Sequence, residues 1–580
     1  MRDRLIVMLF TLLSFGAAHA GSVTVCPVGC DYSTIQGAVN ALEPGGTITL
    51  LTTLPHTETD IIINKDVVIQ GVDRQQTVVQ AFEQPNSSAG RVFTILPNLI
   101  VTFRDFTIQN GGADNGDGGG IWIQSSDTQS LVTLLRVNIR NNRATNGGGI
   151  FNEARLVMRD FSIVGNSIVG VAGGGIANTS YAELYDGEVV NNYAETLGGG
   201  LSSRNVQGST PTLIVQGVSI RGNRATRGAG IANYGAMTVT GDSEISSNES
   251  FFRGGGIFHS GDSLAVIEHS KVNENQVTRG LDDGNLLGGG IFSEAPMQIR
   301  DSAINANMTP DSEFGNNGGG LYVQSTDMTL ERVQIAFNKA TSGGGMFIPQ
   351  FSAVSIRDSA IYDNSATNGG GGITQVQAAL RISNTTIENN RTERFGGGIL
   401  KCSGELFLAH VTIANNVANS DGMLDGDGGG LSVDCTPTTT DIRNSIIAEN
   451  TVMGMGVYPD CDAPFTGSFS MIGDPGPSTG ERCAIGSMFQ QGMIYNTVGD
   501  VFDPPTGVGH AYSLPLKPLS LAIDGARCFD ADGDPLAFDQ RGAPMPVDGD
   551  GDGEADCDMG AVEFGSVPVL LDPVFFDGFE

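Results

Sequence analysis

The stretch "ATNGGGIFN" at residues 144–152 places three glycines directly before an apolar residue, and relatives of it recur along this chain of 580 residues. They include "VAGGGIAN" at 171–178, "ATRGAGIAN" at 225–233 and "ATSGGGMF" at 340–347. Glycine loses more backbone entropy on folding than any other residue and has no side chain to pack. Its repeated clustering therefore indicates a turn that every repeat must make, and we expect Gly147, Gly148 and Gly149 to form one such turn.

The apolar residue after each glycine cluster marks the period of the repeat. It recurs at intervals of 25 to 34 residues, and a period in this range is typical of solenoids, propellers and repeat arrays. Propeller blades are longer, because each contains four strands. The leucine spacing of leucine-rich repeats and the recurring aspartate of RTX nonapeptides are absent from the sequence. The positions are Ile121, Ile150, Ile176, Leu201, Ile231, Ile257, Ile291, Leu321, Met346, Ile373, Ile399 and Leu431.

The segments between the glycine clusters have the pattern of β-strands. In "TLIVQGVSIRGN" at 212–223, apolar and β-branched residues alternate with polar ones, as they do in strands with one buried face. Helical periodicity is absent from the repeats. We therefore predict an all-β fold, a single-stranded parallel β-helix whose coils contain two or three short strands and stack about 4.8 Å apart.

An asparagine ends the strand that precedes most glycine clusters. Asparagine tolerates the left-handed backbone conformation of a turn, and a buried amide needs hydrogen-bond partners, which stacked copies of itself supply. We expect an internal ladder of stacked amides, and we prefer this structural role to ligand binding. The asparagines are Asn142, Asn223, Asn338, Asn364, Asn390 and Asn416.

The N-terminal region carries two signals of its own. Residues 1–20 combine the basic Arg2 and Arg4, an apolar stretch at 5–15 and an A-x-A sequence at 18–20, which predict a signal peptide. We expect export to the extracellular space or to the outer membrane and cell surface. No later stretch approaches the roughly 20 apolar residues of a membrane-spanning helix. In "YSTIQGAVNALEPGGTITL" at 32–50, Ser33 as N-cap with Gln36 predicts a short helix that covers the open end of the β-helix.

The formal net charge is −33. Nucleic acids and anionic membrane surfaces attract basic proteins, so this charge argues against both as partners. A strongly acidic surface favours solubility in an exported protein, and it leaves divalent-cation binding open as an alternative.

The opening residues and the repeats resemble known exported proteins. The helix followed by "PGGTITL" and "VVIQGV" (67–72) resembles the start of right-handed β-helix proteins of the pectin-lyase-like superfamily, and units such as "GGGIFN" are similar to the repeats of polymorphic outer-membrane proteins. After Leu431 the triplets stop, and "AIDGA", "DQRG" and "CDMGAVE" within 515–564 resemble the choice-of-anchor Q domain, which implies sorting or anchoring. We therefore expect a signal peptide at 1–20, a right-handed β-helix at 21–455, a choice-of-anchor Q-like region at 456–565 and a tail at 566–580.

The acidic stretch "DGDGDGEAD" at 548–556 is the most specific local motif. It matches the D-x-D-x-D-G start of a calcium-binding loop, but Met559 stands where the bidentate glutamate belongs. Another acid, such as Asp558, would have to substitute for that glutamate, and a solvated acidic loop without calcium is the alternative. The candidate Ca²⁺ ligands are Asp548, Asp550, Asp552, Glu554 and Asp556.

Eight cysteines in an exported chain predict disulfides. Cys528 and Cys557 flank the acidic loop and are expected to close it. Cys402 and Cys435 follow equivalent apolar residues of consecutive coils, which would place them within disulfide distance. The remaining pairs, by elimination, are Cys26–Cys30 and Cys461–Cys483.

No convergent catalytic set is visible in the sequence. A glycoside hydrolase needs two carboxylates on one face, and the aspartate pairs lie in variable loops. We therefore predict a non-catalytic surface or secreted rod for adhesion or for binding glycans or cell-surface proteins; the alternative is a polysaccharide lyase or glycoside hydrolase. The aspartate pairs are Asp114 and Asp117, Asp282 and Asp283, and Asp425 and Asp427, and the single histidines are His56, His259, His269, His410 and His510.

Overall fold

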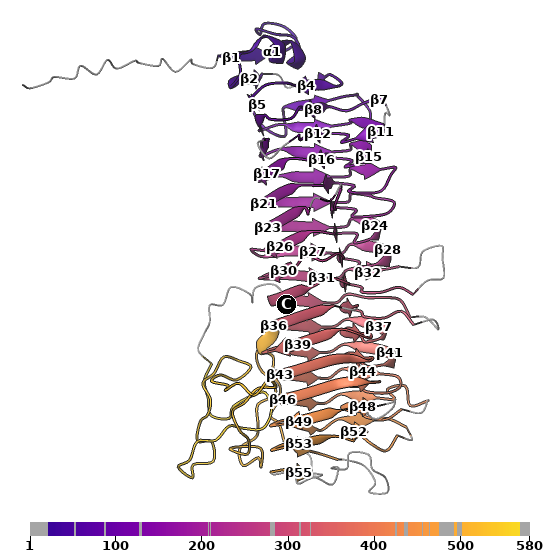
Figure 1. Ribbon diagram of the computed structural model, residues 1–580, viewed down its shortest axis with the longest axis vertical. Helices are drawn as coiled ribbons and strands as arrows, with labels where there is room; N and C mark the ends of the chain where they lie inside the picture. Colours follow the sequence, from indigo (N-terminus) through magenta and orange to yellow (C-terminus); the bar gives the residue numbers. More distant parts are fainter. Residues whose placement is uncertain are drawn as a thin grey trace, which may run out of the picture.

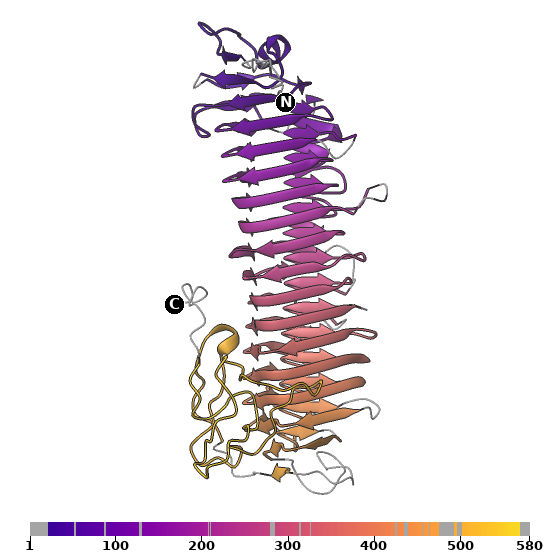
Figure 2. The same ribbon diagram turned by 60° about the vertical axis from the view of Figure 1, so that its left-hand side comes forward.

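A computed structural model describes residues 21–568, apart from 52–53, 86–88, 127–129, 207, 209, 279–284, 312–314, 325, 424–425, 434–438, 455, 463, 475–491 and 496–500. The predicted signal peptide and most of the predicted tail lie outside the described residues. The chain winds into a long rod of stacked coils (Figures 1 and 2). Every pairing between described strands is parallel except that of β11 with β7. The predicted parallel β-helix is thereby confirmed.

Three faces run along the rod. Sheet A has 28 described strands, sheet B has 15, and the third face consists of groups of four, three and five strands. The strands of sheet B are β4 (Ile61–Ile63), β8 (Phe93–Ile95), β12 (Ile121–Ile123), β16 (Ile150–Asn152), β20 (Ile176–Asn178), β22 (Leu201–Ser203), β25 (Ile231–Asn233), β29 (Ile257–His259), β33 (Ile291–Ser293), β35 (Leu321–Val323), β38 (Met346–Ile348), β42 (Ile373–Gln375), β45 (Ile399–Lys401), β48 (Leu431–Val433) and β52 (Cys461–Asp462).

The strands of sheet A are β1 (Ser22–Val25), β2 (Gly46–Leu50), β3 (His56–Thr57), β5 (Val67–Gln70), β6 (Val78–Gln80), β9 (Ile100–Arg104), β10 (Thr107–Gln109), β13 (Leu131–Leu135), β14 (Asn138–Arg140), β17 (Arg155–Arg159), β18 (Ser162–Val164), β21 (Tyr181–Val190), β23 (Thr212–Arg221), β26 (Ala236–Thr240), β27 (Ser243–Ser246), β30 (Ala265–Glu268), β31 (Ser270–Asn273), β34 (Met297–Asn305), β36 (Asp327–Ala336), β39 (Ala353–Arg357), β40 (Ala360–Tyr362), β43 (Ala378–Glu388), β46 (Gly404–Ala414), β49 (Thr440–Arg443), β50 (Ile446–Ala448), β53 (Thr466–Ser468), β54 (Met471–Ile472) and β55 (Ile494–Tyr495). The third face contains β7 (Ala89–Gly90), β11 (Gly112–Asp117), β15 (Arg143–Asn146), β19 (Ser167–Ile168), β24 (Arg224–Arg227), β28 (Glu249–Arg253), β32 (Gln276–Val277), β37 (Lys339–Ser342), β41 (Ser365–Gly369), β44 (Arg391–Thr392), β47 (Val417–Ala418) and β51 (Thr451–Val452).

The apolar residues that mark the repeat stack in register along sheet B. Ile121 pairs with Ile150, Ile150 with Ile176, and the series continues without a break to Leu431. These side chains are buried inside the coils and belong to one hydrophobic core along the rod. The period seen in the sequence is therefore the length of one coil.

Each glycine of the triplet has its own reason to be glycine. Gly147 has φ +60°, a conformation that residues with a Cβ rarely adopt. A Cβ on Gly148 would lie 2.4 Å from the carbonyl oxygen of Ser167 and 2.5 Å from that of Gly174. A Cβ on Gly149 would lie 2.6 Å from the carbonyl oxygen of Gly175. The corner combines one left-handed residue with two close approaches to the next coil.

The asparagine ladder runs through most of the rod. Each amide Nδ2 donates to the Oδ1 of the asparagine one coil further on, at 2.9–3.1 Å. At the end of the ladder Asn450 donates to Asp460, and burial raises the pKa of Asp460 to about 6. All these amides are buried, so the ladder is structural. Its members are Asn142, Asn166, Asn192, Asn223, Asn248, Asn275, Asn307, Asn338, Asn364, Asn390, Asn416 and Asn450.

A short helix covers the N-terminal end of the rod (Figure 1). It is α1 (Ile35–Ala41), and Ile35, Ala38 and Val39 on its inner side are buried. The N-cap is Thr34, whose side chain accepts from the backbone N–H of Gly37, so the prediction of Ser33 with a Gln36 capping box was wrong. The carboxylate of Glu58, from the next coil, accepts the free N–H groups of the first turn.

The coils continue past the expected boundary at residue 455. Strands β53, β54 and β55 pair in parallel with the coils before them, so the solenoid reaches Tyr495 and the predicted range 21–455 was too short. The following segment, 501–568, turns back and lies along the outer face of sheet A (Figures 1 and 2). Only a 3-10 turn, η1 (Gly509–Ala511), is regular there among the described residues.

The outer face of sheet A is apolar where this C-terminal segment covers it. The outward-facing Ala414, Ile446, Ala448 and Met471 form a core with apolar residues of the segment. Most of these are Leu514, Leu516, Ala522, Ile523, Met545 and Met559. The last coils therefore carry apolar residues on the outer face as well as inside, whereas an exposed sheet alternates between apolar and polar residues.

Candidate functional site

The acidic loop brings two of its predicted ligands together. Carboxylate oxygens of Asp548 and Asp550 lie within 4.8 Å of one another and of a carboxylate oxygen of Asp524. Asp552, Glu554 and Asp556 are exposed and do not belong to this group. The third member, Asp524, belongs to the "AIDGA" motif 24 residues upstream of Asp548 and was not predicted as a ligand.

Asp524 has one oxygen available for a ligand. Its Oδ2 accepts from the backbone N–H groups of Gly549 and Asp550 at 2.9 and 2.8 Å. Its Oδ1 is buried and has no hydrogen-bond partner among the described residues. Carboxylate oxygens are the ligands that Ca²⁺ prefers, so these three residues fit a divalent cation. Asp558, the predicted substitute for the missing glutamate, is instead buried and accepts the backbone N–H groups of Asp524 and Phe564.

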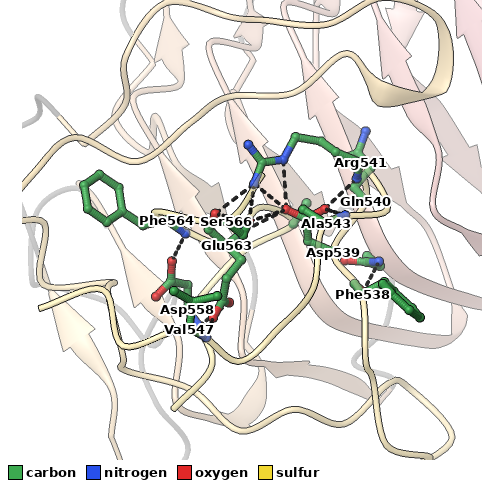
Figure 3. Close-up of polar contacts among 12 residues, drawn as sticks. Phe538, Asp539, Gln540, Arg541, Ala543, Val547, Asp558, Glu563, Phe564 and Ser566 are labelled. Atoms are coloured by element: carbon green, nitrogen blue, oxygen red, sulfur yellow. Dashed lines mark hydrogen bonds and ion pairs between the residues drawn. The ribbon is translucent and has the colours of Figure 1, made fainter. Parts of the chain in front are cut away.

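The motifs of the C-terminal segment meet in one buried polar cluster (Figure 3). Arg541 forms an ion pair with the buried Asp539 at 2.5 Å and donates to the carbonyl oxygen of Glu563 at 2.8 Å. Glu563 accepts from the backbone of Val547 and Asp558. Burial raises the pKa of Asp558 to about 7, and burial together with the nearby Asp558 raises that of Glu563 to about 8. These acidic groups hold the turns of the segment together.

The same segment is fastened to the coils by polar contacts. Gln540 accepts from the Thr386 hydroxyl at 2.6 Å, and the Thr412 hydroxyl accepts from the backbone of Ala561. The buried His410 contacts the carbonyl oxygen of Arg527 at 2.8 Å. The ring of Tyr512 stacks on that of Tyr362, with centroids 4.0 Å apart. "DQRG" and "CDMGAVE" therefore serve the packing of the segment.

Two of the predicted disulfides are confirmed. They are Cys26–Cys30 and Cys528–Cys557, each with a Cα–Cα distance of 5.4 Å. Cys402 and Cys461 are each disulfide-bonded. Their predicted partners, Cys435 and Cys483, lie outside the described residues, so these two pairings stay predictions.

The described aspartates among those considered for catalysis have structural partners. Asp114 pairs with Arg143 at 3.1 Å, and Asp117 accepts from Asn146 at 2.8 Å. Asp427 accepts from the backbone N–H of Val457. Asp282, Asp283 and Asp425 lie outside the described residues.

The other single histidines do not gather with these aspartates. His259 is buried and contacts Asn233 at 3.0 Å, and burial lowers its pKa. His56 is buried as well. The exposed His269 lies next to Glu268 and Asp301, but both carboxylate oxygens of Asp301 are bound by Arg332, which leaves that group a poor metal site.

A second surface was missed by sequence analysis. On the outer face of sheet A, β17 presents Arg155, Val157 and Arg159, and β21 presents Tyr181, Glu183 and Tyr185 directly beside them in register. We refer to these six residues as the outer-face cluster. The signal was present in "RLVMR" (155–159) and "YAELY" (181–185), whose alternate residues must share one face of a strand.

Stacking and hydrogen bonds hold the outer-face cluster in place. The guanidinium of Arg159 lies 3.9 Å from the centroid of the Tyr185 ring, and that of Arg155 lies 5.4 Å from the Tyr181 ring. Glu183 accepts from Arg155 at 3.0 Å and from the Tyr185 hydroxyl at 3.1 Å. Burial raises the pKa of Glu183, but hydrogen bonds from Tyr181, Arg155 and Tyr185 outweigh burial and hold the pKa below its usual range. The cluster thus presents two aromatic rings around a carboxylate that is ionised at neutral pH.

A family model supports the fold. Residues 297–469 match a family model described as "Right handed beta helix region". Among solved structures, the A-module of the Azotobacter vinelandii mannuronan C-5 epimerase AlgE6 is similar, with 13% identity and a TM-score of 0.22 over 80% of this chain and 91% of that one. No curated protein matches the chain. Among the described residues, no helix is both long and apolar enough to span a membrane.

Proposed function

We propose that this protein is an exported, non-catalytic rod that binds an extended glycan at the outer-face cluster. The observation that carries the proposal is the pair of half-exposed tyrosine rings, Tyr181 and Tyr185, on one strand of a rigid sheet. Alternate residues of a strand are roughly 6.6 Å apart, so the two rings are separated by roughly 13 Å, enough for several sugar units. Between them, the buried Glu183 carboxylate accepts from Arg155 and from the Tyr185 hydroxyl and so fixes the position of the Tyr185 ring.

Binding suits the cluster better than cleavage does. Hydrolysis of a glycosidic bond normally needs two carboxyl groups that flank it, and the six residues of the outer-face cluster include only Glu183. Its carboxylate is also occupied by Arg155 and Tyr185. The partner class that we propose is a glycan on a cell surface or in the surrounding matrix.

We propose that the protein acts outside the cytoplasm, in the extracellular space or at the cell surface. The disulfides Cys26–Cys30 and Cys528–Cys557 support this location, because disulfides persist in oxidising compartments. The predicted signal peptide supports it as well. An anchoring role of the C-terminal segment remains an expectation from resemblance.

Glycan binding is tested with a panel of neutral and uronic-acid polysaccharides. We expect Tyr185→Ala to weaken the affinity for the bound glycan roughly tenfold, because a stacked ring contributes about 0.5–1.5 kcal/mol or more. Isothermal titration calorimetry measures the loss, and Tyr193→Ala, an exposed tyrosine on the third face, is the matched control. Equal affinities of wild type and Tyr185→Ala would refute the site. Release of reducing or unsaturated ends would instead establish the enzyme alternative.

We also propose that Asp524, Asp548 and Asp550 bind Ca²⁺. We expect added Ca²⁺ to raise the melting temperature and to bind in calorimetry, and Asp524→Asn to abolish both effects, because it removes one carboxylate from the group. Asp556→Asn, in the same loop but outside the group, is the matched control and should retain both. Absence of Ca²⁺ binding to the wild-type protein would contradict the proposal.

A further inference from the structure

Two arginines on the third face lie side by side without a carboxylate partner. Arg227 at the end of β24 is the register neighbour of Arg253 at the end of β28. Among the described residues, neither forms a salt bridge within 4.0 Å. The Nε atoms of both are buried and have no hydrogen-bond acceptor in that part of the chain. Like charges directly opposite each other on neighbouring strands are destabilising, so this pair costs stability unless something else neutralises it.

This chain offers many acidic partners, and arginines close to the pair in sequence use them. It contains 64 acidic and 31 basic residues, and acceptors are abundant. Arg224, three residues before Arg227 on the same strand, pairs with Glu249. Arg221 pairs with Glu188 on sheet A. Among the described residues, the carboxylate whose charge acts on Arg253 is that of Glu294, which lies beyond salt-bridge distance.

Aromatic rings hold the two guanidinium groups in place. Arg253 lies 4.7 Å from the Phe252 ring centroid and 4.9 Å from that of Phe292. Arg227 lies 5.6 Å from Phe252 and 5.9 Å from Phe258. These contacts fix the planes of the guanidinium groups in advance, so little side-chain entropy is lost when an acceptor binds. The rings behind them form a column of Tyr234, Phe258, Phe292, Tyr322 and Phe347 with centroids 5.3–5.7 Å apart.

The charges are also partly removed from water. Arg227 and Arg253 are both half-buried. Burial lowers the pKa of Arg253, and the charge of Arg227 adds to that effect while Glu294 opposes it. A half-buried positive charge with a buried N–H group that has no acceptor is a costly arrangement.

We propose that Arg227 and Arg253 form a binding site for an oxyanion, a carboxylate or sulfate group. Such a group accepts paired N–H donors from planar guanidinium groups in bidentate geometry. It would satisfy the unused donors and remove the repulsion between the two arginines. The adjoining half-buried rings of Tyr234 and Phe252 suit an anion that is carried on a sugar ring. The site is separate from the outer-face cluster, and each can fail without the other.

The test uses the full mature protein and two probes, sodium sulfate and sodium glucuronate, at constant ionic strength with chloride as the reference. We expect either probe to raise the melting temperature of the wild type, and Arg253→Met and Arg227→Met to weaken binding about tenfold or more, because each removes a charged donor. Methionine keeps the apolar stem that packs on the rings. Arg221→Met, which removes an arginine that already has a partner, should bind as the wild type does.

A response to glucuronate alone supports an anion carried on a sugar, and a response to both probes supports a site for free or attached oxyanions. If Arg253→Met does not fold, Arg253→Lys keeps a positive charge, and loss of bidentate binding by this variant still supports the site. The proposal is overturned if neither probe raises the melting temperature of the wild type more than chloride does. It is also overturned if the probes raise the melting temperature of the arginine variants as much as that of the wild type.

Discussion

Replacing Gly148 with alanine is expected to lower the free energy of unfolding by more than about 4 kcal/mol, an exceptional loss for one methyl group. The added Cβ would lie 2.4 Å from the carbonyl oxygen of Ser167 and 2.5 Å from that of Gly174. Both oxygens belong to the backbone of the next coil and cannot move without separating the coils. The midpoint of urea unfolding, followed by circular dichroism, measures the loss.

The control for Gly148 is Gly116→Ala, whose Cβ would meet only the end of the flexible Arg91 side chain. We expect this variant to unfold near the wild-type midpoint. The chain itself carries Ala229 at the position equivalent to Gly148. The Cβ of Ala229 is accommodated in its own coil, whereas a Cβ on Gly148 would lie 2.4 Å from the Ser167 carbonyl oxygen. A Gly148→Ala protein as stable as the wild type would show that close approach does not explain the glycine pattern.

Asn275→Ala is expected to destabilise the rod by roughly 2–6 kcal/mol, about 1–3 for each of two buried groups that lose this partner, the backbone N–H of Asn248 and the carbonyl oxygen of Ile245. Asn275 Oδ1 accepts from the backbone N–H and from Nδ2 of Asn248, at 3.0 and 2.9 Å. Its Nδ2 donates to the carbonyl oxygen of Ile245 at 2.7 Å and to Asn307 at 3.0 Å. Alanine supplies none of these bonds, and the buried ladder is interrupted.

Thermal and urea unfolding measure the effect of Asn275→Ala. The exposed Asn205→Ala, which removes one hydrogen bond to Gly208, is the control and should change stability by about 0.5 kcal/mol or less. A change at Asn275 no larger than at Asn205 would contradict the structural role of the ladder.

The sequence was sufficient to predict the β-helical coil, because the residue types that build each coil recur at the period of the coil. Glycine clusters, inward apolar residues and asparagines each repeat once per coil, so one aligned set of positions reveals corner, core and ladder together. Cys528–Cys557 could also be predicted, because a loop closed by flanking cysteines is a local pattern.

The functional surfaces could not be predicted in the same way. The outer-face cluster combines residues of two coils, and its members look like ordinary outward-facing side chains until the register of β17 and β21 is known. Asp524 joins Asp548 and Asp550 only because the segment folds back on itself. The end of the solenoid was placed too early because β53 to β55 lack the glycine triplet that marks the other coils. The prediction of Ser33 as N-cap was wrong because the side chain of Thr34 and the carboxylate of Glu58, a residue of the next coil, accept the N–H groups of the first turn instead.

The proposed function rests on contact between a glycan and the tyrosines of the outer-face cluster, and hydroxyl-radical footprinting tests that contact most directly. The intact protein is oxidised with and without a glycan that binds it, and the modification of each tyrosine is read by mass spectrometry. We predict that the glycan protects Tyr181 and Tyr185 and leaves the exposed Tyr193 unchanged. Unchanged oxidation of Tyr181 and Tyr185 in the presence of saturating glycan would contradict the proposed binding site.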